Sequence, residues 1–591
     1  MASCVSRHTP GEFRSRRFAG GATGFGKSVA AHRLSGEEPF KVQGLEIRKM
    51  AWRGSSFGRG IKAVAAAVEP DRPALIHGDR VVSWSEFDRL TDNIAANLLA
   101  RGLRKGDVAG QHLRNCPEYM LAWFGCAKAG IIPVNVNYQY KAGELRDILN
   151  RFGVKALFTS TEFGGLIEEV RGDIPGLGEP IEVDGDRGDW QGLSETAVPG
   201  DFEVEDDPGC LFYLATGGTT GMPKAVMWPH LDAWEVLQVS AWPRGGIAAP
   251  PWIAPSLEDH AAEAARHPPP SEVTRSPSLI LCPMMHGTGM FAATNQLLHG
   301  STLATLPDRH FDADRTIDAI RDLGVRAVVI VGDAFARPLI DRLEARDDGA
   351  EAIATMSYLF SSGAIFSMDV KQRFTALNPN LVIADALGSS EAGGTAVNLT
   401  TAAGSTAGGD FTAVPDRGLK IVDENLNAIP PGSEEFGMIA RAGPLPLGYL
   451  GEDEKNAKTF PMIDGVRYLM TGDQARMRED GSLEFKGRDN MCINSGGEKI
   501  FPEEVERALM AHPEVADVRV VGVPDERFGN KVTAVVQSRG DTEGLDARLD
   551  AYVRQQIAGY KIPRLYKFTD ASLRLNNGKP DYRTAQRIAE G

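Results

Sequence analysis

A glycine- and threonine-rich loop follows an apolar segment and ends at a lysine in residues 211–224, LFYLATGGTTGMPK. Glycines let backbone N–H groups approach an anion closely, and threonine hydroxyls add further donors. Lys224 supplies a positive charge. The alternative, a plain turn after a strand, accounts poorly for so many donors. The pattern therefore predicts a triphosphate site formed by Thr216, Gly217, Gly218, Thr219, Thr220, Gly221 and Lys224.

A second phosphate-binding pattern occurs near the N-terminus, where residues 21–28, GATGFGKS, match GxxxxGK[ST]. This motif works only between a hydrophobic strand and a helix. The preceding residues, FRSRRFAG, are too basic to form a buried strand. A P-loop NTPase is therefore the weaker of the two hypotheses.

Five titratable side chains lie in short polar segments further along the chain: His286, Glu391, Asp473, Arg488 and Lys579. Glu391 ends the segment LGSSE, and a carboxylate beside hydroxyl donors suits Mg²⁺ on a phosphate. A lone histidine is more often structural than catalytic. A loop aspartate, arginine or lysine is usually a solvated surface residue. Taken singly, these side chains carry no firm functional prediction.

In its context the phosphate loop at residues 214–224 resembles the signature loop of the adenylate-forming superfamily, which contains acyl-CoA synthetases, luciferases and peptide-synthetase adenylation domains. The other motifs of that superfamily follow in the same order. They are residues 361–365 (SSGAI), 387–391 (LGSSE), 468–473 (YLMTGD), 487–504 (GR to IFPEE) and 577–579 (NGK). The ordered set identifies the superfamily, although any one motif alone would not.

This resemblance implies an ATP-dependent, AMP-forming ligase that works in two half-reactions. ATP and a carboxylate first give an acyl-adenylate and pyrophosphate, and a thiol then takes the acyl group and releases AMP. The implied cofactors are ATP, Mg²⁺ and coenzyme A. The implied fold has a large N-terminal domain of several subdomains and a small mobile C-terminal domain that rotates between the half-reactions.

The resemblance also implies roles for individual residues. Lys579 is expected to stabilise the charge that develops at the carboxylate and the α-phosphate during adenylation. Asp473 is expected to bind the ribose hydroxyls, and Arg488 to donate to ribose or phosphate. The implied catalytic residues are Thr216, Lys224, Glu391 and Lys579, with Glu391 as the Mg²⁺ ligand. The implied adenine-side and nucleotide-side residues are Gly363, Ala364, Leu387, Gly388 and Ser390.

Two further segments resemble the acyl and thiol sites of the family. His286, in PMMHGTG, resembles the acyl-side motif, so we expect it to line the acyl site with Gly388. The segment 495–499, SGGEK, resembles the glycine-rich loop beside the pantetheine channel of CoA ligases. It predicts CoA contacts from Ser495, Gly496 and Gly497.

The sequence departs from the family pattern at two positions. Leu387 stands where the family has an adenine-stacking aromatic residue, and an aliphatic side chain can still cover a purine face. Asn490 stands at the hinge, where aspartate or lysine is usual; asparagine tolerates unusual backbone angles. The two departures leave a catalytically degenerate nucleotide-binding homologue as one alternative, and an enzyme using another thiol acceptor as a second.

The substrate class is suggested by three segments together. LGSSE, PMMHGTGMF and TGGTTGMPKAVMWPH look most like fatty-acyl and steroid side-chain CoA ligases of the actinobacterial type. They predict a hydrophobic carboxylic acid. The chain length, branching and ring content of the acid are left open.

The surrounding pattern predicts an α/β protein. Strands and helices alternate from about Ile61 to Ala440, which predicts parallel sheets covered by helices with sites at the strand ends. Examples are a strand at 325–331, a helix at 334–345, a strand at 356–360, a helix at 368–377 and a strand at 381–384. Residues 243–276, rich in proline and alanine, predict a surface excursion with a helix at 256–266.

A small α+β domain is predicted after about Arg488. Its expected elements are helices at 502–511 and 545–557, a half-buried strand at 515–521 and a strand at 531–537. The expected domains are an unstructured extension or misassigned start at 1–49, an AMP-binding domain at 50–487 and the mobile domain at 488–591.

Composition restricts the partners. The net charge of −15 argues against general binding to nucleic acid or anionic membranes. Six scattered cysteines predict reduced, mostly buried thiols rather than disulfides or a zinc site. The apolar run 121–134 is too short for a membrane span. The expected location is the cytoplasm, with an organellar transit peptide in the basic stretch 1–36 as the alternative, and a homodimer is one open oligomeric state.

Overall fold

The computed structural model describes residues 41–42, 45–46, 54–197, 202–216, 223–239, 254–266, 277–363, 366, 368–405, 411–414, 418–488, 493–500, 502–573 and 581–591. The chain forms two compact units, Met1–Met50 and Ala51–Gly591. In the first unit, β1 (Lys41–Val42) and β2 (Leu45–Glu46) pair antiparallel. The GATGFGKS motif and the basic stretch 1–36 lie outside the described residues.

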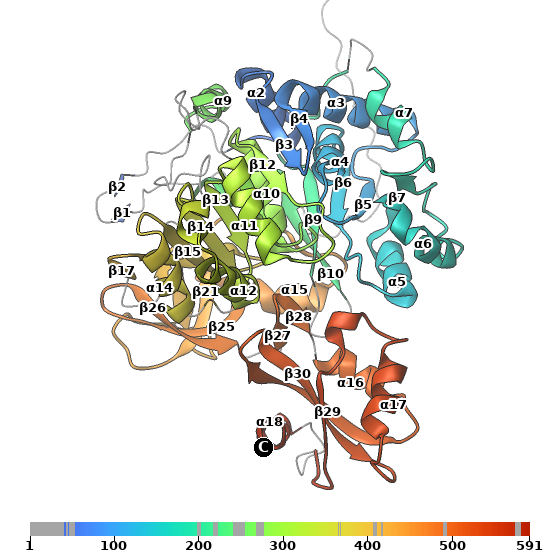
Figure 1. The fold of residues 1–591 in the computed structure, drawn as a ribbon, viewed down its shortest axis with the longest axis vertical. Helices are drawn as coiled ribbons and strands as arrows, with labels where there is room; N and C mark the ends of the chain where they lie inside the picture. The colour runs from blue at the N-terminus through green and yellow to red at the C-terminus, as the bar shows by residue number, and fades with distance from the viewer. Residues whose placement is uncertain are drawn as a thin grey trace, which may run out of the picture. The chain divides into compact units, whose positions relative to one another are not determined.

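The second unit contains two large sheets, and the smaller of them carries the two strands that flank the phosphate loop (Figure 1). Its strands, in spatial order, are β22 (Gly448–Tyr449), β10 (Lys224–Pro229), β9 (Leu211–Thr216), β6 (Ile132–Asn135), β5 (Val108–His112), β7 (Val154–Thr159) and β8 (Ile181–Glu182). Strands β5 to β9 are parallel, whereas β10 runs antiparallel to both of its neighbours, β9 and β22. The phosphate loop therefore connects two strands that pair antiparallel.

The larger sheet is parallel in one half only. Its parallel strands, in spatial order, are β15 (Val382–Ser389), β14 (Tyr358–Ser362), β13 (Ala327–Ile330), β11 (Ser278–Ile280), β12 (Leu303–Thr305) and β3 (Pro73–His77). Beyond β15 the strands are antiparallel: β16 (Gly393–Thr401), β18 (Phe411–Ala413), β26 (Ser482–Arg488), β25 (Leu469–Met477), β21 (Gly437–Arg441), β19 (Lys420–Val422) and β20 (Ala428–Ile429). β17 (Gly404–Ser405) pairs with β16, and β4 (Arg80–Ser83) with β3.

The prediction of parallel strands up to Ala440 is therefore wrong beyond β15. No described helix separates β16 from β21, and strands joined by short connections pair antiparallel. The prediction is confirmed for the preceding segment. The helix at 368–377 has the predicted bounds as α14 (Met368–Leu377), and α12 (Gly332–Ala345) begins two residues before its predicted start.

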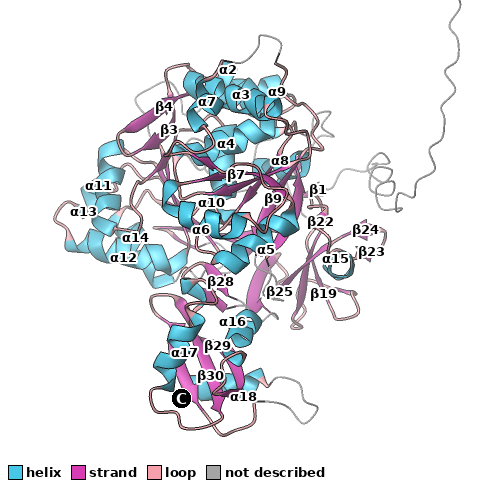
Figure 2. Ribbon diagram, turned by 90° about the vertical axis from the view of Figure 1, so that its right-hand side faces the viewer, coloured by secondary structure: helices cyan, strands magenta, loops and turns pink. Residues whose placement is uncertain are grey.

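Alternate residues of the parallel strands pack into two different cores. Val328 and Ile330 pack against α11 (Ala313–Leu323), α12 and α14, which lie together on one side of the sheet (Figure 2). Val329 faces the central core, with α10 (Gly287–Leu298) and α4 (Pro117–Lys128). Burial on both faces explains why these strands read as continuous apolar runs.

Further helices complete the layers. Helices α5 (Ala142–Phe152) and α6 (Gly164–Arg171) cover the face of the smaller sheet that is turned away from the central core. The central core also contains α2 (Phe57–Ala67), α3 (Trp84–Ala100) and α8 (His230–Val239), while α7 (Trp190–Glu195) packs on α3. The predicted helix at 256–266 is α9 (Leu257–Arg266). It is more than a surface excursion, because it packs on α2 and its His260 Nε2 lies 2.7 Å from the Leu298 carbonyl oxygen.

The apolar run 121–134 divides between α4 and β6. No described helix combines the length and apolar character that a membrane crossing requires. Four cysteines lie in the described part of the chain, Cys116, Cys126, Cys210 and Cys282. All four are free thiols and three are buried, as predicted.

The small α+β domain is confirmed (Figure 1, orange to red). Its sheet contains β28 (Glu498–Ile500), β27 (Ile493–Ser495), β30 (Gly529–Ser538), β29 (Val515–Asp525) and β31 (Leu565–Phe568). Its helices are α16 (Pro502–Met510), α17 (Leu545–Val553) and α18 (Tyr582–Glu590). β26 ends at Arg488 in the large sheet and β27 begins at Ile493, so the boundary near 488 stays our interpretation.

The predicted half-exposure of β29 is wrong. Asp517 and Arg519 are 6% and 4% exposed, because α18 covers the outer face of the strand. Arg519 pairs with Asp517 at 3.1 Å, and its guanidinium lies over the Tyr582 ring of α18. Charged residues that alternate with valines therefore pack here against a second layer rather than facing water.

Candidate active site

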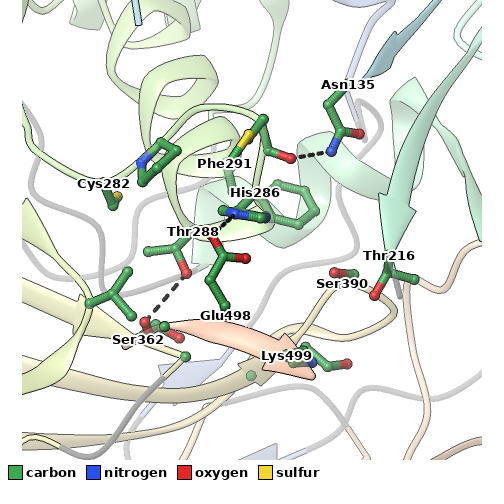
Figure 3. Close-up of a pocket in the computed structure, with 18 of the residues that line it drawn as sticks. Asn135, Thr216, Cys282, His286, Thr288, Phe291, Ser362, Ser390, Glu498 and Lys499 are labelled. Atoms are coloured by element: carbon green, nitrogen blue, oxygen red, sulfur yellow. Dashed lines mark hydrogen bonds and ion pairs between the residues drawn. The ribbon is translucent and has the colours of Figure 1, made fainter. Parts of the chain in front are cut away.

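A cavity of about 400 Å³ lies at the carboxyl ends of the parallel strands of both sheets (Figure 3). Strands β6 and β9 contribute from the smaller sheet, and β14 and β15 from the larger one. The β27–β28 hairpin of the small domain contributes as well. Ligand sites in open α/β sheets lie at such strand ends, so this cavity is the candidate active site.

The cavity gathers many, but not all, of the predicted site residues. Those that line it are Thr216, His286, Gly363, Gly388, Ser390, Ser495, Gly496 and Gly497. Lys224, Leu387, Glu391 and Asp473 are described but do not line it. Arg488 is described only as part of β26. Gly217, Gly218, Thr219, Thr220, Gly221, Ala364, Asn490 and Lys579 lie outside the described residues.

The start of the phosphate loop is held by Asn135, which sequence reasoning missed. Thr216 and Lys224 are cross-strand partners at the ends of β9 and β10. The buried Asn135 accepts a hydrogen bond from the Ala215 N–H at 2.7 Å and donates to the Met285 carbonyl. It therefore joins the start of the loop to the segment that carries His286 (Figure 3). The only sequence signal was a polar residue at the end of a buried strand.

Glu391 lies in a cluster of charged groups beside the phosphate loop. The Tyr449 hydroxyl donates to Glu391 Oε1 at 2.8 Å. Burial alone would raise the pKa of Glu391, but the Lys499 ammonium and the Tyr449 hydroxyl hold it below its ordinary value. Lys224 is 3% exposed and pairs with Glu452 at 3.4 Å. Glu391 is therefore held ionised next to the loop.

A third lysine, Lys455, belongs to this cluster with Lys224 and Lys499. Lys455, on α15 (Asp453–Thr459), has its ammonium 5.2 Å from the centre of the Tyr449 ring, and the Lys224 ammonium lies 5.8 Å from the same centre. Burial and the neighbouring Lys224 lower the pKa of Lys455 to about 8.

The predicted ribose-binding residues come together through strand pairing. Asp473 on β25 lies directly opposite Arg488 on β26, and Asp473 is 3% exposed. Leu387 packs against a small apolar cluster that contains Ala396 and Leu483. Its predicted adenine contact, like the other individual roles, stays a prediction.

His286 forms an ion pair with the small domain. Its Nε2 lies 3.0 Å from Glu498 Oε1, as Figure 3 shows. Burial alone would lower the pKa of His286, but the Glu498 carboxylate outweighs that effect and raises it. His286 therefore contacts the small domain as well as lining the cavity.

Gly496 and Gly497 form the turn of the β27–β28 hairpin, with φ of 58° and 85°. Left-handed backbone of this kind favours glycine. A Cβ on Gly497 would lie 2.5 Å from Val331 Cγ1 of the large domain. The hairpin therefore fits against the large domain only without a side chain at this position.

Lys561 makes a second contact between the domains. Its ammonium lies 2.6 Å from Glu504 of α16 and 2.6 Å from Glu144 of α5. Both carboxylates compete for one ammonium at a buried position. Burial and the nearby Glu144 raise the pKa of Glu504 to about 7.

This contact should weaken as the pH rises. Burial at this contact and the nearby Glu144 raise the pKa of Glu504 above its ordinary 4.5, so we expect the docked arrangement to bind the proton more tightly than the separated domains do. Its contribution is present at low pH and is lost as the pH rises through about 7. Energy transfer between dyes on α6 and α17 should therefore report less docking at alkaline pH. Glu504→Gln should flatten this dependence, and an unchanged pH profile in that variant would contradict the assignment.

Comparison with known proteins defines the class. Residues 63–450 match the AMP-binding enzyme family, and residues 504–579 match the AMP-binding enzyme C-terminal domain. The chain belongs to the AMP-binding enzymes of the adenylate-forming superfamily, as the ordered motifs predicted.

Particular relatives are similar over nearly the whole chain. The medium/long-chain-fatty-acid–CoA/3-oxocholest-4-en-26-oate–CoA ligase of Mycolicibacterium smegmatis is 39% identical over 538 residues, covering 88% of this chain and 94% of that protein. The 3-oxocholest-4-en-26-oate–CoA ligase of Rhodococcus rhodochrous is 37% identical over 535 residues, covering 88% and 93%. The amide bond synthetase McbA of Marinactinospora thermotolerans has the same fold, with a TM-score of 0.74 at 18% identity over 91% of this chain and 100% of that one.

Proposed function

We propose that this protein is an ATP-dependent, AMP-forming ligase that joins a hydrophobic carboxylic acid to coenzyme A. The observation that supports it most is the composition of one cavity. The cavity is lined by Thr216 of the phosphate loop, by Gly388 and Ser390 of the LGSSE segment, and by the SGGEK hairpin of the small domain. Nucleotide, acid and thiol can thus meet at one place.

In the first half-reaction, a carboxylate oxygen of the acid attacks the α-phosphorus of ATP. The bond between the α-phosphorus and the bridging oxygen breaks, and pyrophosphate leaves with the electron pair. The phosphate loop and Lys224 would hold the triphosphate. Asp473, the cross-strand partner of Arg488, would bind the ribose. Lys579 would stabilise the charge that develops at the α-phosphate.

Glu391 fits the role of a Mg²⁺ ligand. The described residues contain no group of three or more His, Cys, Asp or Glu side chains arranged for a metal. Mg²⁺ commonly uses one or two carboxylates, with the remaining positions filled by substrate phosphates and water. A single ionised Glu391 beside the phosphate loop matches that pattern. The ion would neutralise charge on the leaving pyrophosphate.

In the second half-reaction, the CoA sulfur attacks the acyl carbonyl of the adenylate, the thiol proton is lost to solvent or a base, and AMP leaves. The β27–β28 hairpin lies at the cavity, with Phe528 and Arg564 of the small domain also lining it. Gly497 lets the backbone of this hairpin approach Val331 of the large domain closely, so the hairpin would border the path of a pantetheine arm. These contacts support the use of the described domain arrangement in thioester formation.

The acid is proposed to be hydrophobic. Apolar residues that line the cavity include Val236, Leu237, Phe291, Val397 and Val414. Apolar surface of this kind stabilises a bound hydrocarbon by removing it from water. The fatty-acid and steroid-acid ligase activities in the names of the similar proteins point the same way.

A panel of acids tests this substrate class. Each buried methylene contributes about 0.8 kcal/mol, so octanoate should exceed propionate in kcat/KM by about 10³-fold. The panel should contain short, medium and long fatty acids and a steroid side-chain acid, with CoA-dependent AMP release as the readout. If acetate or propionate gave the highest kcat/KM, the hydrophobic assignment would be wrong.

A further inference from the structure

The phosphate-loop lysine has a neighbour with the same charge. Lys455 and Lys224 lie near the same tyrosine ring, that of Tyr449, at 5.2 and 5.8 Å from its centre. The hydroxyl of this tyrosine donates to Glu391, the proposed Mg²⁺ ligand. β22, which contains Tyr449, pairs with β10, which begins at Lys224. Helix α15 therefore presents Lys455 near Lys224, the last residue of the phosphate-loop motif.

The cluster has an arrangement of charge that favours a further anion. Lys224 and Lys455 are close enough to repel each other. Glu452 lies 3.4 Å from Lys224, but it also pairs with Arg151. The Glu452 carboxylate is thus shared between Lys224 and Arg151, and the Glu391 carboxylate would bind Mg²⁺. A multiply charged anion between the two lysines would relieve their repulsion.

We infer that Lys455 is a second phosphate-binding residue, which contacts the β- and γ-phosphates of ATP and the pyrophosphate that they become. The inference rests on the proposed adenylating function. We assign it to the outer phosphates because Lys455 lies near Lys224 of the phosphate loop, at the same Tyr449 ring. The expected nucleoside contacts are elsewhere, at Gly363 after β14 and at Asp473 on β25. Removal of the Lys455 charge should therefore weaken the binding of ATP and of pyrophosphate but leave the binding of AMP unaffected.

Three variants separate this role from simple packing. Lys455→Met keeps an unbranched stem over the Tyr449 ring but removes the charge. Lys455→Arg keeps the charge. Lys458→Met is the matched control, because Lys458 is exposed on the same helix. Acid-dependent exchange of pyrophosphate into ATP gives the KM for ATP and for pyrophosphate, and AMP product inhibition gives the affinity for AMP.

Lys455→Met should raise the KM for ATP and for pyrophosphate by roughly 10- to 100-fold, the usual worth of a charge-assisted hydrogen bond. Inhibition by AMP, and thioester formation from preformed acyl-adenylate, should stay within about twofold, while Lys455→Arg and Lys458→Met should resemble the unmodified protein. Unchanged KM values in Lys455→Met would overturn the inference, as would an equal loss of AMP affinity. If the unmodified protein showed no acid-dependent exchange, the proposed function would fail instead.

Discussion

Lys579→Ala should lower acyl-adenylate formation by about 10²- to 10³-fold, the usual cost of losing one preorganised charge contact in a transition state. The same variant should still convert preformed acyl-adenylate and CoA into acyl-CoA. Lys579 itself lies outside the described residues, but those on either side of that segment are placed. The Asp581 N–H donates to the Leu573 carbonyl at 2.9 Å, and Leu573 packs with Val521 and Ala585.

None of these flanking residues lines the cavity, although the β27–β28 hairpin of the same domain does. We therefore expect the described arrangement to serve the thiol step without Lys579. Pyrophosphate release and thioester formation should be measured separately, with Lys567→Ala on β31 as the matched control. Equal losses in both half-reactions would show that Lys579 is not specific to adenylation.

Gly497→Val should show the opposite pattern, with thioester formation lowered about 10²-fold and adenylation retained. A β-branched residue is strained at φ of 85°, and its Cβ would lie 2.5 Å from Val331. Such backbone strain and overpacking each cost about 1–3 kcal/mol. The overpacking applies only when the hairpin is seated against Val331 of the large domain, whereas the backbone strain belongs to the hairpin turn itself. The phosphate-loop end and Asn135 belong to the large domain and should be unaffected.

Gly540→Val is a suitable control, because a Cβ there meets nothing within 4 Å and its φ is not left-handed. Single-turnover formation of acyl-adenylate and its consumption by CoA should be followed in both variants. If Gly497→Val lost adenylation as severely as thioester formation, the hairpin would have a general structural role rather than one in the second step.

The sequence was most informative where one short segment contains a whole motif. The phosphate-loop strand, Glu391 and the SGGEK hairpin were predicted to belong to the site because each lies in a short motif of neighbouring residues. Strand register then explained what the motifs could not: Asp473 and Arg488 are distant in a linear reading but are cross-strand partners.

Residues whose partners are remote in sequence were missed. Lys561 contacts Glu144, 417 residues away, and Asn135 contacts Ala215, 80 residues away. Neither contact produces a recognisable motif among the neighbouring residues in the sequence. The burial of Asp517 and Arg519 was predicted wrongly for a related reason. Alternation of polar and apolar residues shows that the two faces of a strand differ, but it does not show whether a later helix covers the polar face.

The central claim is that this chain couples ATP cleavage to thioester formation through an acyl-adenylate. The most direct measurement is the product balance of one reaction containing ATP, Mg²⁺, CoA and a hydrophobic acid. We predict AMP, pyrophosphate and acyl-CoA in equal amounts, with none of the three formed when the acid is omitted. ADP and inorganic phosphate in place of AMP and pyrophosphate would contradict the account, and so would AMP released without an acyl-CoA thioester.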